Sequence, residues 1–411
     1  MLLCLLVSKY SLKFQVYGLL DSSFDISMNI LIFEPGELGH QPTYLALFVT
    51  AFHELGHKVY VLSGIDLSSK KVLLESSFPL PPFTGFIGKP PFGKRQYVKG
   101  WWLFARKHID RVKKDLPQDF IVFFPYLDFF IDNYLHSFEL DRIFPYPWTG
   151  LYMNPKNHRV KYSFSQWRYG PFEPNHLLLS KNCKGIGCLD EMAIDWLQQK
   201  AKKRVIHIPD VIDDSVNKVP FTKASEMDQI IKDKKRILLI GSLEKRKGIM
   251  FLFDLLERGL LGDFALVMIG KLGKTGFTEG DLTKLRDYER APSTNHFFHF
   301  ERVPTEADFN DFIKLSDILY ASYKDFPYSS NMPGKSAYLE KPIVVSNGGY
   351  MEFIVKKYNL GLSIDYGNIQ QLRDALISLP RKDESDFAGY RKDHSLLRFQ
   401  DQTQSLLDQY E

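Results

Sequence analysis

The sequence alternates short apolar runs with amphipathic segments of helical length, and this alternation limits the possible fold more than any other feature. Runs rich in Val, Ile and Leu recur at 29–35, 58–64, 119–125, 204–210, 236–242, 265–271, 317–323 and 342–348. Near-continuous apolar runs are typical of strands covered on both faces, and helices between such strands indicate parallel sheets. The pattern therefore predicts an α/β fold of doubly wound parallel sheets.

The length of the chain and one linker-like segment predict two domains. The chain has 411 residues, whereas a single core rarely grows beyond about 250–300 residues. The segment 207–220, "HIPDVIDDSVNKVP", follows a strand run and is rich in proline and aspartate. We therefore expect two Rossmann-like domains, over 28–210 and 211–385, that face each other across an interdomain cleft in which ligands bind.

The two ends of the sequence are expected to lie outside these domains. Residues 1–27 precede the first domain, either as a disordered extension or as sequence upstream of the true start. Residues 386–411 include a polar helical segment, which we expect to cross back to the N-terminal domain.

Composition argues against several classes of protein. The net charge of +4 comes without a dense Lys/Arg stripe, so nucleic acid is not an expected partner. The three cysteines, Cys4, Cys183 and Cys188, do not suit a disulfide framework, which favours a reducing, cytoplasmic compartment. We expect no membrane-spanning helix, because no run of about 18 uncharged apolar residues occurs.

The loop after the first strand run is a candidate anion site. In "EPGELGHQP" (34–42), Gly36 and Gly39 let the backbone approach a ligand, and the following helix start favours phosphate or carboxylate. His40 lies in the same loop, either directed into the cleft or as a surface residue of a tight turn. The spacing is not G-x-G-x-x-G, which argues against a dinucleotide.

Two further loops combine a helix start with positive charge. The first runs from Gly241 through the three cations 245–247, which suit a diphosphate clamp or a solvated charge run. The second is "YSSNMPGKSAYLEKP" (328–342), where Asn331 stands at the expected N-cap. The free N–H groups of this helix start attract anions, and the predicted ligand-binding residues are Asn331, Gly334, Lys335 and Ser336.

The order and spacing of several motifs resemble glycosyltransferase family 4, within the GT-B superfamily, over about residues 29–370. The loop from Gly241 to Gly248 resembles the family's G-R-L-x-x-x-K-G loop, and "KPIVVSNGGYMEFI" (341–354) resembles its glycine turn. The resemblance implies that Lys247 binds the donor diphosphate and that Glu352 is the family's glutamate. Ser242 stands at the family's arginine, so that contact is weakened or is supplied by Arg246 or Lys245.

The chain departs from the family at its pair of glutamates. The family's second glutamate lies seven positions before the proline that is Pro342 here, and this sequence has Lys335 at that position. The first roughly corresponds to Asp325, which the resemblance places near the reacting sugar. Lysine cannot accept hydrogen bonds from ribose hydroxyls. Either the ribose is held otherwise, or Lys335 binds phosphate, or it is a solvated helix residue.

The acceptor side is expected in the N-terminal domain. The family's histidine after the fourth strand is missing from 119–134, and Asp128 is the nearest polar candidate for catalysis. The turn-rich, aromatic segment 145–155 either lines the acceptor side or packs Trp148 and Tyr152 into the core.

The resemblance implies a retaining glycosyltransferase of polysaccharide biosynthesis that moves a hexosyl or related sugar from a nucleotide-diphosphate donor to a glycan or lipid-linked acceptor. No Asp-x-Asp pair occurs, so we expect no metal and no cofactor. Two other functions remain open: a nucleotide-sugar-binding accessory protein without catalysis and, with less support, a nucleotide-sugar epimerase. An NAD-dependent oxidoreductase has the least support.

The segment 88–114 mixes basic residues with Trp101, Trp102 and Phe104. This composition suits weak peripheral contact with the anionic inner face of a membrane. A buried helix with a solvated basic side explains the same residues.

Overall fold

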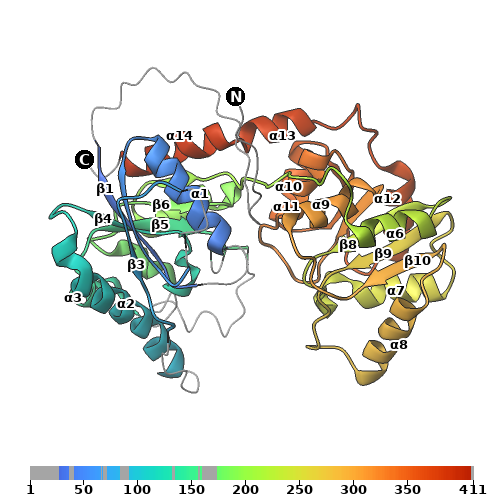
Figure 1. Cartoon of the computed structure of the whole chain (residues 1–411), viewed down its shortest axis with the longest axis horizontal. Coiled ribbons are helices and arrows are strands. Elements are labelled where there is room, and N and C mark those ends of the chain that lie inside the picture. Colours follow the sequence, from blue (N-terminus) through green and yellow to red (C-terminus); the bar gives the residue numbers. More distant parts are fainter. Residues whose placement is uncertain are drawn as a thin grey trace, which may run out of the picture. The chain divides into compact units, whose positions relative to one another are not determined.

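A computed structural model describes residues 27–36, 41–65, 67, 72–83, 92–131, 135–155, 158–159 and 174–408. These residues form two compact units (Figure 1). The N-terminal unit contains the described residues up to 209 together with 396–408, and the C-terminal unit contains 210–395.

The N-terminal unit is built on a parallel sheet in which seven described strands lie in the order β3-β2-β1-β4-β5-β6-β7. The strands are β1 (Asn29–Glu34), β2 (Lys58–Ser63), β3 (Ser76–Pro79), β4 (Ile121–Phe124), β5 (Trp148–Tyr152), β6 (Ile186–Cys188) and β7 (Val205–His207). The helices are α1 (Gln41–Glu54), α2 (Phe92–Val112), α3 (Ser137–Ile143), α5 (Ile194–Ala201) and α14 (Leu396–Leu407), with short 3-10 helices at Lys113–Asp115, Leu127–Phe129, Pro174–Leu179 and Glu191–Ala193.

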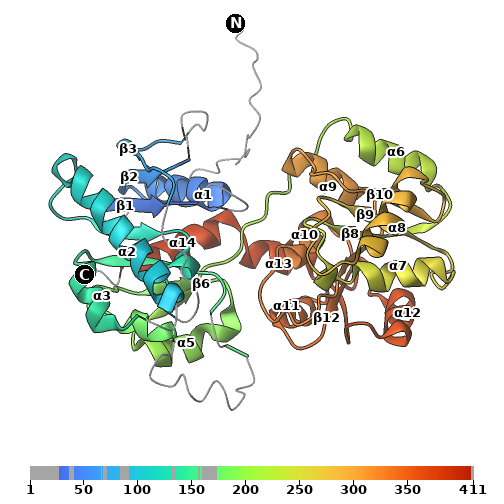
Figure 2. The same cartoon turned by 90° about the horizontal axis from the view of Figure 1, so that it is seen from below.

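Helix α14 completes the core of the N-terminal unit, although it lies far from the rest of that unit in sequence. It packs against α1, β6 and β7, as both views of the ribbon show (Figures 1 and 2). The ring of Phe399 lies 4.9 Å from that of Phe48, and His57 Nε2 lies 2.9 Å from Gln404 Oε1. Residues 396–407 therefore belong to the fold of this unit.

The C-terminal unit repeats the plan with six described parallel strands in the order β10-β9-β8-β11-β12-β13. They are β8 (Lys235–Ile240), β9 (Phe264–Ile269), β10 (His296–His299), β11 (Ile318–Ala321), β12 (Ile343–Ser346) and β13 (Gly361–Ile364). The helices are α6 (Thr222–Ile230), α7 (Ile249–Glu257), α8 (Glu279–Arg290), α9 (Glu306–Lys314), α10 (Met332–Leu339), α11 (Tyr350–Lys357), α12 (Ile369–Ser378) and α13 (Phe387–Asp393), with a 3-10 turn at Lys245–Lys247.

Each of the eight apolar runs coincides with most or all of a strand, which confirms the predicted α/β fold of two parallel sheets. The alternative that the aromatic segment 145–155 lines an acceptor surface was wrong for its two largest rings. Trp148 and Tyr152 begin and end β5 and are fully buried, because the strand lies inside the sheet with both faces covered. Cys183 and Cys188 are buried free thiols.

Helix α2 is amphipathic in the ordinary sense. Trp102 is fully buried and Trp101 almost so, and both pack in an aromatic cluster under the helix. Lys107, Arg111 and Lys114 point to solvent from α2 and the turn after it. The arrangement favours a buried helix with a basic outer side. Among the described helices, none is both long enough and apolar enough to cross a membrane.

Candidate functional site

The central strands of the C-terminal unit, β8 and β11, are neighbours whose connections run to opposite sides of the sheet. In doubly wound sheets, this switch point at the carboxyl ends of the strands is where ligands bind. Two loops meet there, 241–248 after β8 and 322–331 after β11. The candidate site is built from these two loops.

Glycines shape the loop after β8. Gly241 has a φ of +112°, a conformation that residues with a Cβ rarely adopt. Gly248 has a φ of +81°, and a Cβ on it would lie 2.9 Å from the Tyr320 hydroxyl of β11. The loop therefore turns back sharply and packs close to the neighbouring strand.

The turn 245–247 is fastened to the loop after β11. The N–H of Lys324 donates to the carbonyl of Arg246 at 2.7 Å, and the Arg246 guanidinium lies 4.9 Å from the Phe326 ring. Because this backbone hydrogen bond joins them, the two loops form one surface.

Lys247 is the most unusual residue of this surface. Within the described part of the chain its ammonium has no hydrogen-bond or ion-pair partner, and it lies 5.2 Å from the centre of the Tyr323 ring. Burial, with a smaller contribution from Arg246, lowers the pKa of Lys247 to about 8. A partly desolvated ammonium without an ion-pair partner, even with Glu244 nearby, is stabilised by an anion that binds next to it.

The two neighbouring cations of the turn are already paired. Lys245 Nζ lies 3.0 Å from Asp281 Oδ2, and Arg246 Nε lies 2.7 Å from Glu244 Oε2. Of the three cations predicted to clamp a diphosphate, Lys247 alone has no such partner among the described residues. The position of Ser242, directly after Gly241, is exposed.

The start of α10 has the predicted form. Asn331 occupies the N-cap position without a side-chain capping bond, and Pro333 is the second helical residue. A Cβ on Gly334 would lie 2.5 Å from Ile212, so this turn of the helix is tightly packed. Ser336 donates its hydroxyl to the carbonyl of Lys341 and is buried.

Lys335 does not lie on the surface of the candidate site. Its side chain is 2% exposed, and its ammonium donates to Asp213, Glu306 and Asn310. The alternative of a solvated helix lysine was therefore wrong, because three acceptors from other segments surround the ammonium. Its assignment as a phosphate ligand stays a prediction.

Two predicted carboxylates lie near these loops. Glu352, in the first turn of α11, accepts hydrogen bonds from the Gly348 N–H at 2.7 Å and the Ser363 hydroxyl at 3.0 Å. Asp325 is exposed and has a φ of +49°. Glu352 therefore holds its own glycine turn, and Asp325 stands at the tip of the loop after β11.

The matching edge of the N-terminal unit carries acids. Asp128 follows β4 and accepts hydrogen bonds from the N–H groups of Met153 and Asn154, both at 3.0 Å. Gly36 donates its N–H to Glu34 Oε1 at 2.8 Å. The predicted residues Gly39 and His40 lie outside the described residues.

Sequence reasoning missed Glu34, the last residue of β1. Its side chain is fully buried, and its Oε2 has no hydrogen-bond partner among the described residues. Burial raises the pKa of Glu34 to about 8, although the Gly36 N–H opposes this shift. Burial also raises the pKa of Tyr126 to about 12, with Asp128 and Glu34 adding to it. A charged residue closing an apolar strand run was the signal that could have found Glu34.

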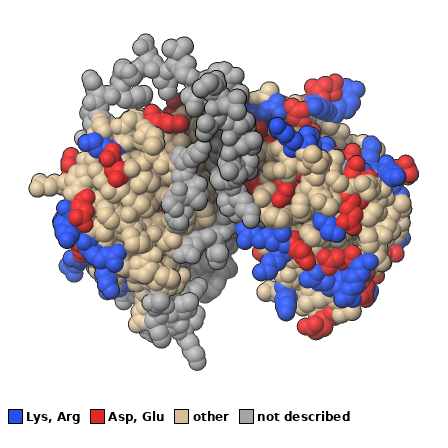
Figure 3. Space-filling view, in the orientation of Figure 1, with Lys and Arg blue, Asp and Glu red and all other residues tan. Residues whose placement is uncertain are grey.

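Two further observations concern the charge on the surface and the side chains that could bind a metal ion. On the face seen in Figure 3, Lys and Arg of the C-terminal unit are interspersed with Asp and Glu. The described residues contain no group of three or more His, Cys, Asp or Glu side chains that could hold a metal ion.

No protein-family model matches the chain, and a search of curated proteins finds no match. Solved structures do resemble it. Sucrose-phosphate synthase from Thermosynechococcus elongatus is 14% identical, covers 93% of this chain and 99% of its own, and gives a TM-score of 0.63. The UDP-forming trehalose-phosphate synthase from Burkholderia xenovorans is 13% identical, covers 93% of this chain and 99% of its own, and gives a TM-score of 0.62.

A third similar structure is a complex with a nucleotide sugar. HepE from Anabaena, in complex with UDP-glucose, is 13% identical, covers 93% of this chain and 99% of its own, and gives a TM-score of 0.61. Likeness over nearly the whole of both chains, at such low identity, shows the fold. The chain has the GT-B fold, with two Rossmann-like α/β units.

Proposed function

We propose that the protein is a glycosyltransferase that moves a sugar from a nucleoside-diphosphate donor to an acceptor hydroxyl. One observation carries this proposal: Lys247 is a partly buried ammonium without a hydrogen-bond or ion-pair partner among the described residues, in the turn after β8. Similar solved structures are described as sugar-phosphate synthases or as bound to UDP-glucose, which supports a nucleotide sugar as the anion.

The charge on Lys247 explains how the site would act. Breaking the bond between the sugar and the diphosphate develops negative charge on the leaving group. A fixed cation aimed at that charge lowers the barrier, and its effect is larger in a site shielded from water. Folding disfavours the charged form of Lys247 by about 3 kcal/mol, as its pKa falls from 10.5 to about 8. An anion beside it offsets this penalty.

The finer parts of the proposal follow the sequence. The absence of an Asp-x-Asp pair supports transfer without a metal. Transfer with retention of configuration, a hexosyl donor, and a glycan or lipid-linked acceptor in the cytoplasm or at the inner membrane face rest on the motifs around Gly241 and Lys247.

The test compares Lys247→Met with Lys284→Met, an exposed lysine of α8 that pairs with Glu257. UDP-glucose is the first probe, followed by a panel of nucleotide sugars, with binding measured by thermal shift and calorimetry. We expect Lys247→Met to weaken binding about 10–100-fold, the worth of one charge-assisted hydrogen bond. Lys284→Met should bind as the wild type does.

Binding should also depend on pH in a predictable direction. Below about pH 8 Lys247 is charged in the free protein. A bound anion favours the charged form, so affinity is full below pH 8 and falls as pH rises above it, by up to about tenfold per unit. Lys247→Met should abolish this dependence.

Two results would change the conclusion. If no nucleotide sugar raises the melting temperature, or if Lys247→Met binds as tightly as wild type, the proposed donor site is wrong. If a nucleotide sugar binds at Lys247 but is neither transferred nor hydrolysed with any acceptor tried, the protein is the nucleotide-sugar-binding accessory protein instead.

A further inference from the structure

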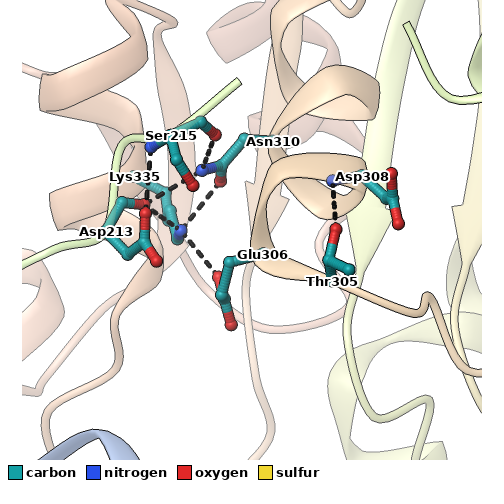
Figure 4. Close-up of polar contacts among 7 residues, drawn as sticks. All are labelled: Asp213, Ser215, Thr305, Glu306, Asp308, Asn310 and Lys335. Atoms are coloured by element: carbon teal, nitrogen blue, oxygen red, sulfur yellow. Dashed lines mark hydrogen bonds and ion pairs between the residues drawn. The ribbon is translucent and has the colours of Figure 1, made fainter. Parts of the chain in front are cut away.

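Lys335 is a buried cation whose hydrogen-bonding capacity is fully used inside the C-terminal unit. Its Nζ donates to Asp213 O at 2.6 Å, to Asn310 Oδ1 at 2.8 Å and to Glu306 Oε2 at 2.9 Å (Figure 4). An ammonium has three N–H donors, so none is left for a ligand. Phe309 adds a ring whose centre lies 5.6 Å from the ammonium.

The sequence of α9 explains why two acceptors point the same way. Thr305 caps the helix by accepting the N–H of Asp308 at 3.1 Å, which places Glu306 in the first turn. Asn310 follows four residues later, on the same face of the helix. Both side chains therefore reach toward Lys335 on α10, as Figure 4 shows.

The third acceptor belongs to the segment that opens the C-terminal unit. Asn310 Nδ2 donates to the carbonyls of Asp213 at 2.9 Å and Ser215 at 2.8 Å, beside the bond from Lys335. Lys335 and Asn310 together saturate the Asp213 carbonyl. This arrangement joins α9, α10 and the segment 213–215 mainly through Lys335 and Asn310, whose side chains are almost completely buried, whereas Glu306 is about half exposed.

A second set of bonds holds the rest of that segment. The Asp311 carboxylate accepts from Asn217 Nδ2 at 2.7 Å and from the Phe221 N–H at 2.8 Å. Asn217 Nδ2 also donates to Asp308 Oδ1 at 2.8 Å. The segment 213–221 is thus tied to α9 along its whole length, and the contact with Lys335 ties α10 to the same frame.

The start of α10 connects this frame to the candidate site. The N–H of Met332 donates to Ser330 Oγ at 3.4 Å, and the Ser330 side chain lies next to the Tyr323 hydroxyl. The Tyr323 ring is the wall next to Lys247. A displacement of the first turn of α10 would therefore move the ring against which the Lys247 ammonium lies.

We propose that Lys335 is a positioning residue: it holds the start of α10 and the loop 322–331 in the arrangement that forms the Lys247 site, and it does not touch the anion. The identity of the anion rests on the proposed function. The mechanical role of Lys335 does not, because it depends only on contacts within the C-terminal unit.

The first experiment needs no ligand. Hydrogen exchange is compared in wild type, Lys335→Met, Lys335→Gln and the control Lys284→Met. Amides in 322–334 and 213–221 should exchange at least about tenfold faster in Lys335→Met, because local opening of this frame becomes easier. Lys335→Gln keeps two N–H donors and should lie between. Unchanged exchange in Lys335→Met would overturn the proposal.

The second experiment separates positioning from direct contact. UDP-glucose binding is measured for Lys247→Met, Lys335→Met and the double variant. A residue that acts through the surroundings of Lys247 gives non-additive losses, so Lys335→Met should add less than about twofold when Lys247 is already Met. Additive losses would mean that Lys335 contacts the anion and would refute the positioning role.

Two controls keep the result decisive. If Lys335→Met loses its near-ultraviolet circular dichroism, Glu306→Gln replaces it, since this change removes one acceptor charge and leaves the lysine in place. Glu306→Gln should speed exchange in 322–334, and no change there would overturn the proposal. If the wild type binds no nucleotide sugar, the proposed function fails, whereas the exchange data still decide the role of Lys335.

Discussion

The two sheets share one strand order around their centre, but side chains of opposite kinds lie at the end of β1 and in the loop after β8. In the N-terminal unit, β1 ends in Glu34, a buried acid whose pKa is raised to about 8. In the C-terminal unit, the loop after β8 carries Lys247, a partly buried cation whose pKa is lowered to about 8. Both groups have a polar atom without a partner among the described residues.

The difference teaches what the fold does and does not determine. The order of strands places a ligand-accessible edge at the same point of both sheets. The residues that follow each strand then set the charge at that edge. At neutral pH the first edge holds a buried, neutral acid and the second a partly exposed cation, so only the second suits an anion.

The largest expected effect concerns Glu34, the acid of the N-terminal unit, and the dependence of stability on pH. The folded state holds the proton of Glu34 up to about pH 8, whereas an unfolded glutamate releases it near 4.5. The folded state therefore binds the extra proton between these values, and stability falls as pH rises through them. From pH 5 to pH 8 the free energy of unfolding should drop by about 4 kcal/mol through this group.

Glu34→Gln should remove that drop, and the exposed Glu75→Gln is the matched control. The readout is urea unfolding followed by tryptophan fluorescence. All five tryptophans lie between residues 101 and 196, so the signal reports the N-terminal unit. A Gln variant with the same pH dependence as wild type would show that Glu34 is not neutral and would end the contrast.

A smaller effect is the difference in stability cost between replacing Gly241, after β8, and replacing Gly36, after β1. Gly241→Ala forces a Cβ into a backbone with φ +112° and should destabilise the C-terminal unit by about 1–3 kcal/mol. In Gly36→Ala the new Cβ first meets the flexible end of the Gln41 side chain, and the change should cost less than about 1 kcal/mol. Hydrogen exchange of β8 reports the first change, and tryptophan fluorescence reports the second. Equal costs would contradict the idea that only the β8 loop needs a special backbone.

The smallest effect concerns the affinity of the Lys247 site for a nucleotide sugar, and it rests on the proposed function. Ser242→Arg adds an exposed charge next to Gly241 and should tighten UDP-glucose binding about two- to fivefold, within the range of surface charge pairs. Salt at about 0.5 M should remove most of the gain. Ser242→Gln, similar in reach but uncharged, should bind as wild type does; an equal gain in that variant would rule out charge as the cause.

The longer apolar runs of the sequence predicted the fold well. Apolar runs of six or seven residues located β1, β2, β8 and β9, because burial on both faces leaves a pattern that depends on one segment alone. Strands such as β6, with three residues, and β13, which begins with Gly361, were not predicted. Their hydrogen bonds come from neighbouring strands, which a single segment does not reveal.

The candidate site was harder to predict for the same reason. The sequence placed Lys247 and Lys335 correctly in a loop and at a helix start. It could not show that Asp281 and Glu244 neutralise the neighbouring cations, or that Asp213, Glu306 and Asn310 surround Lys335. These contacts join residues up to 122 positions apart. The partners of a charge decide whether it is available to a ligand.

Helix α14 has a consequence for the order in which the chain folds during synthesis. Ribosomes add about 5–20 residues per second, so roughly 10–40 seconds separate residue 209 from residue 396. Throughout that interval the surface of α1, β6 and β7 that receives α14 is uncovered. The C-terminal unit, continuous from 210 to 395, can close its own core first. The part of the protein made first is thus finished last, and its exposed Phe48 surface is where a nascent chain would attract chaperones.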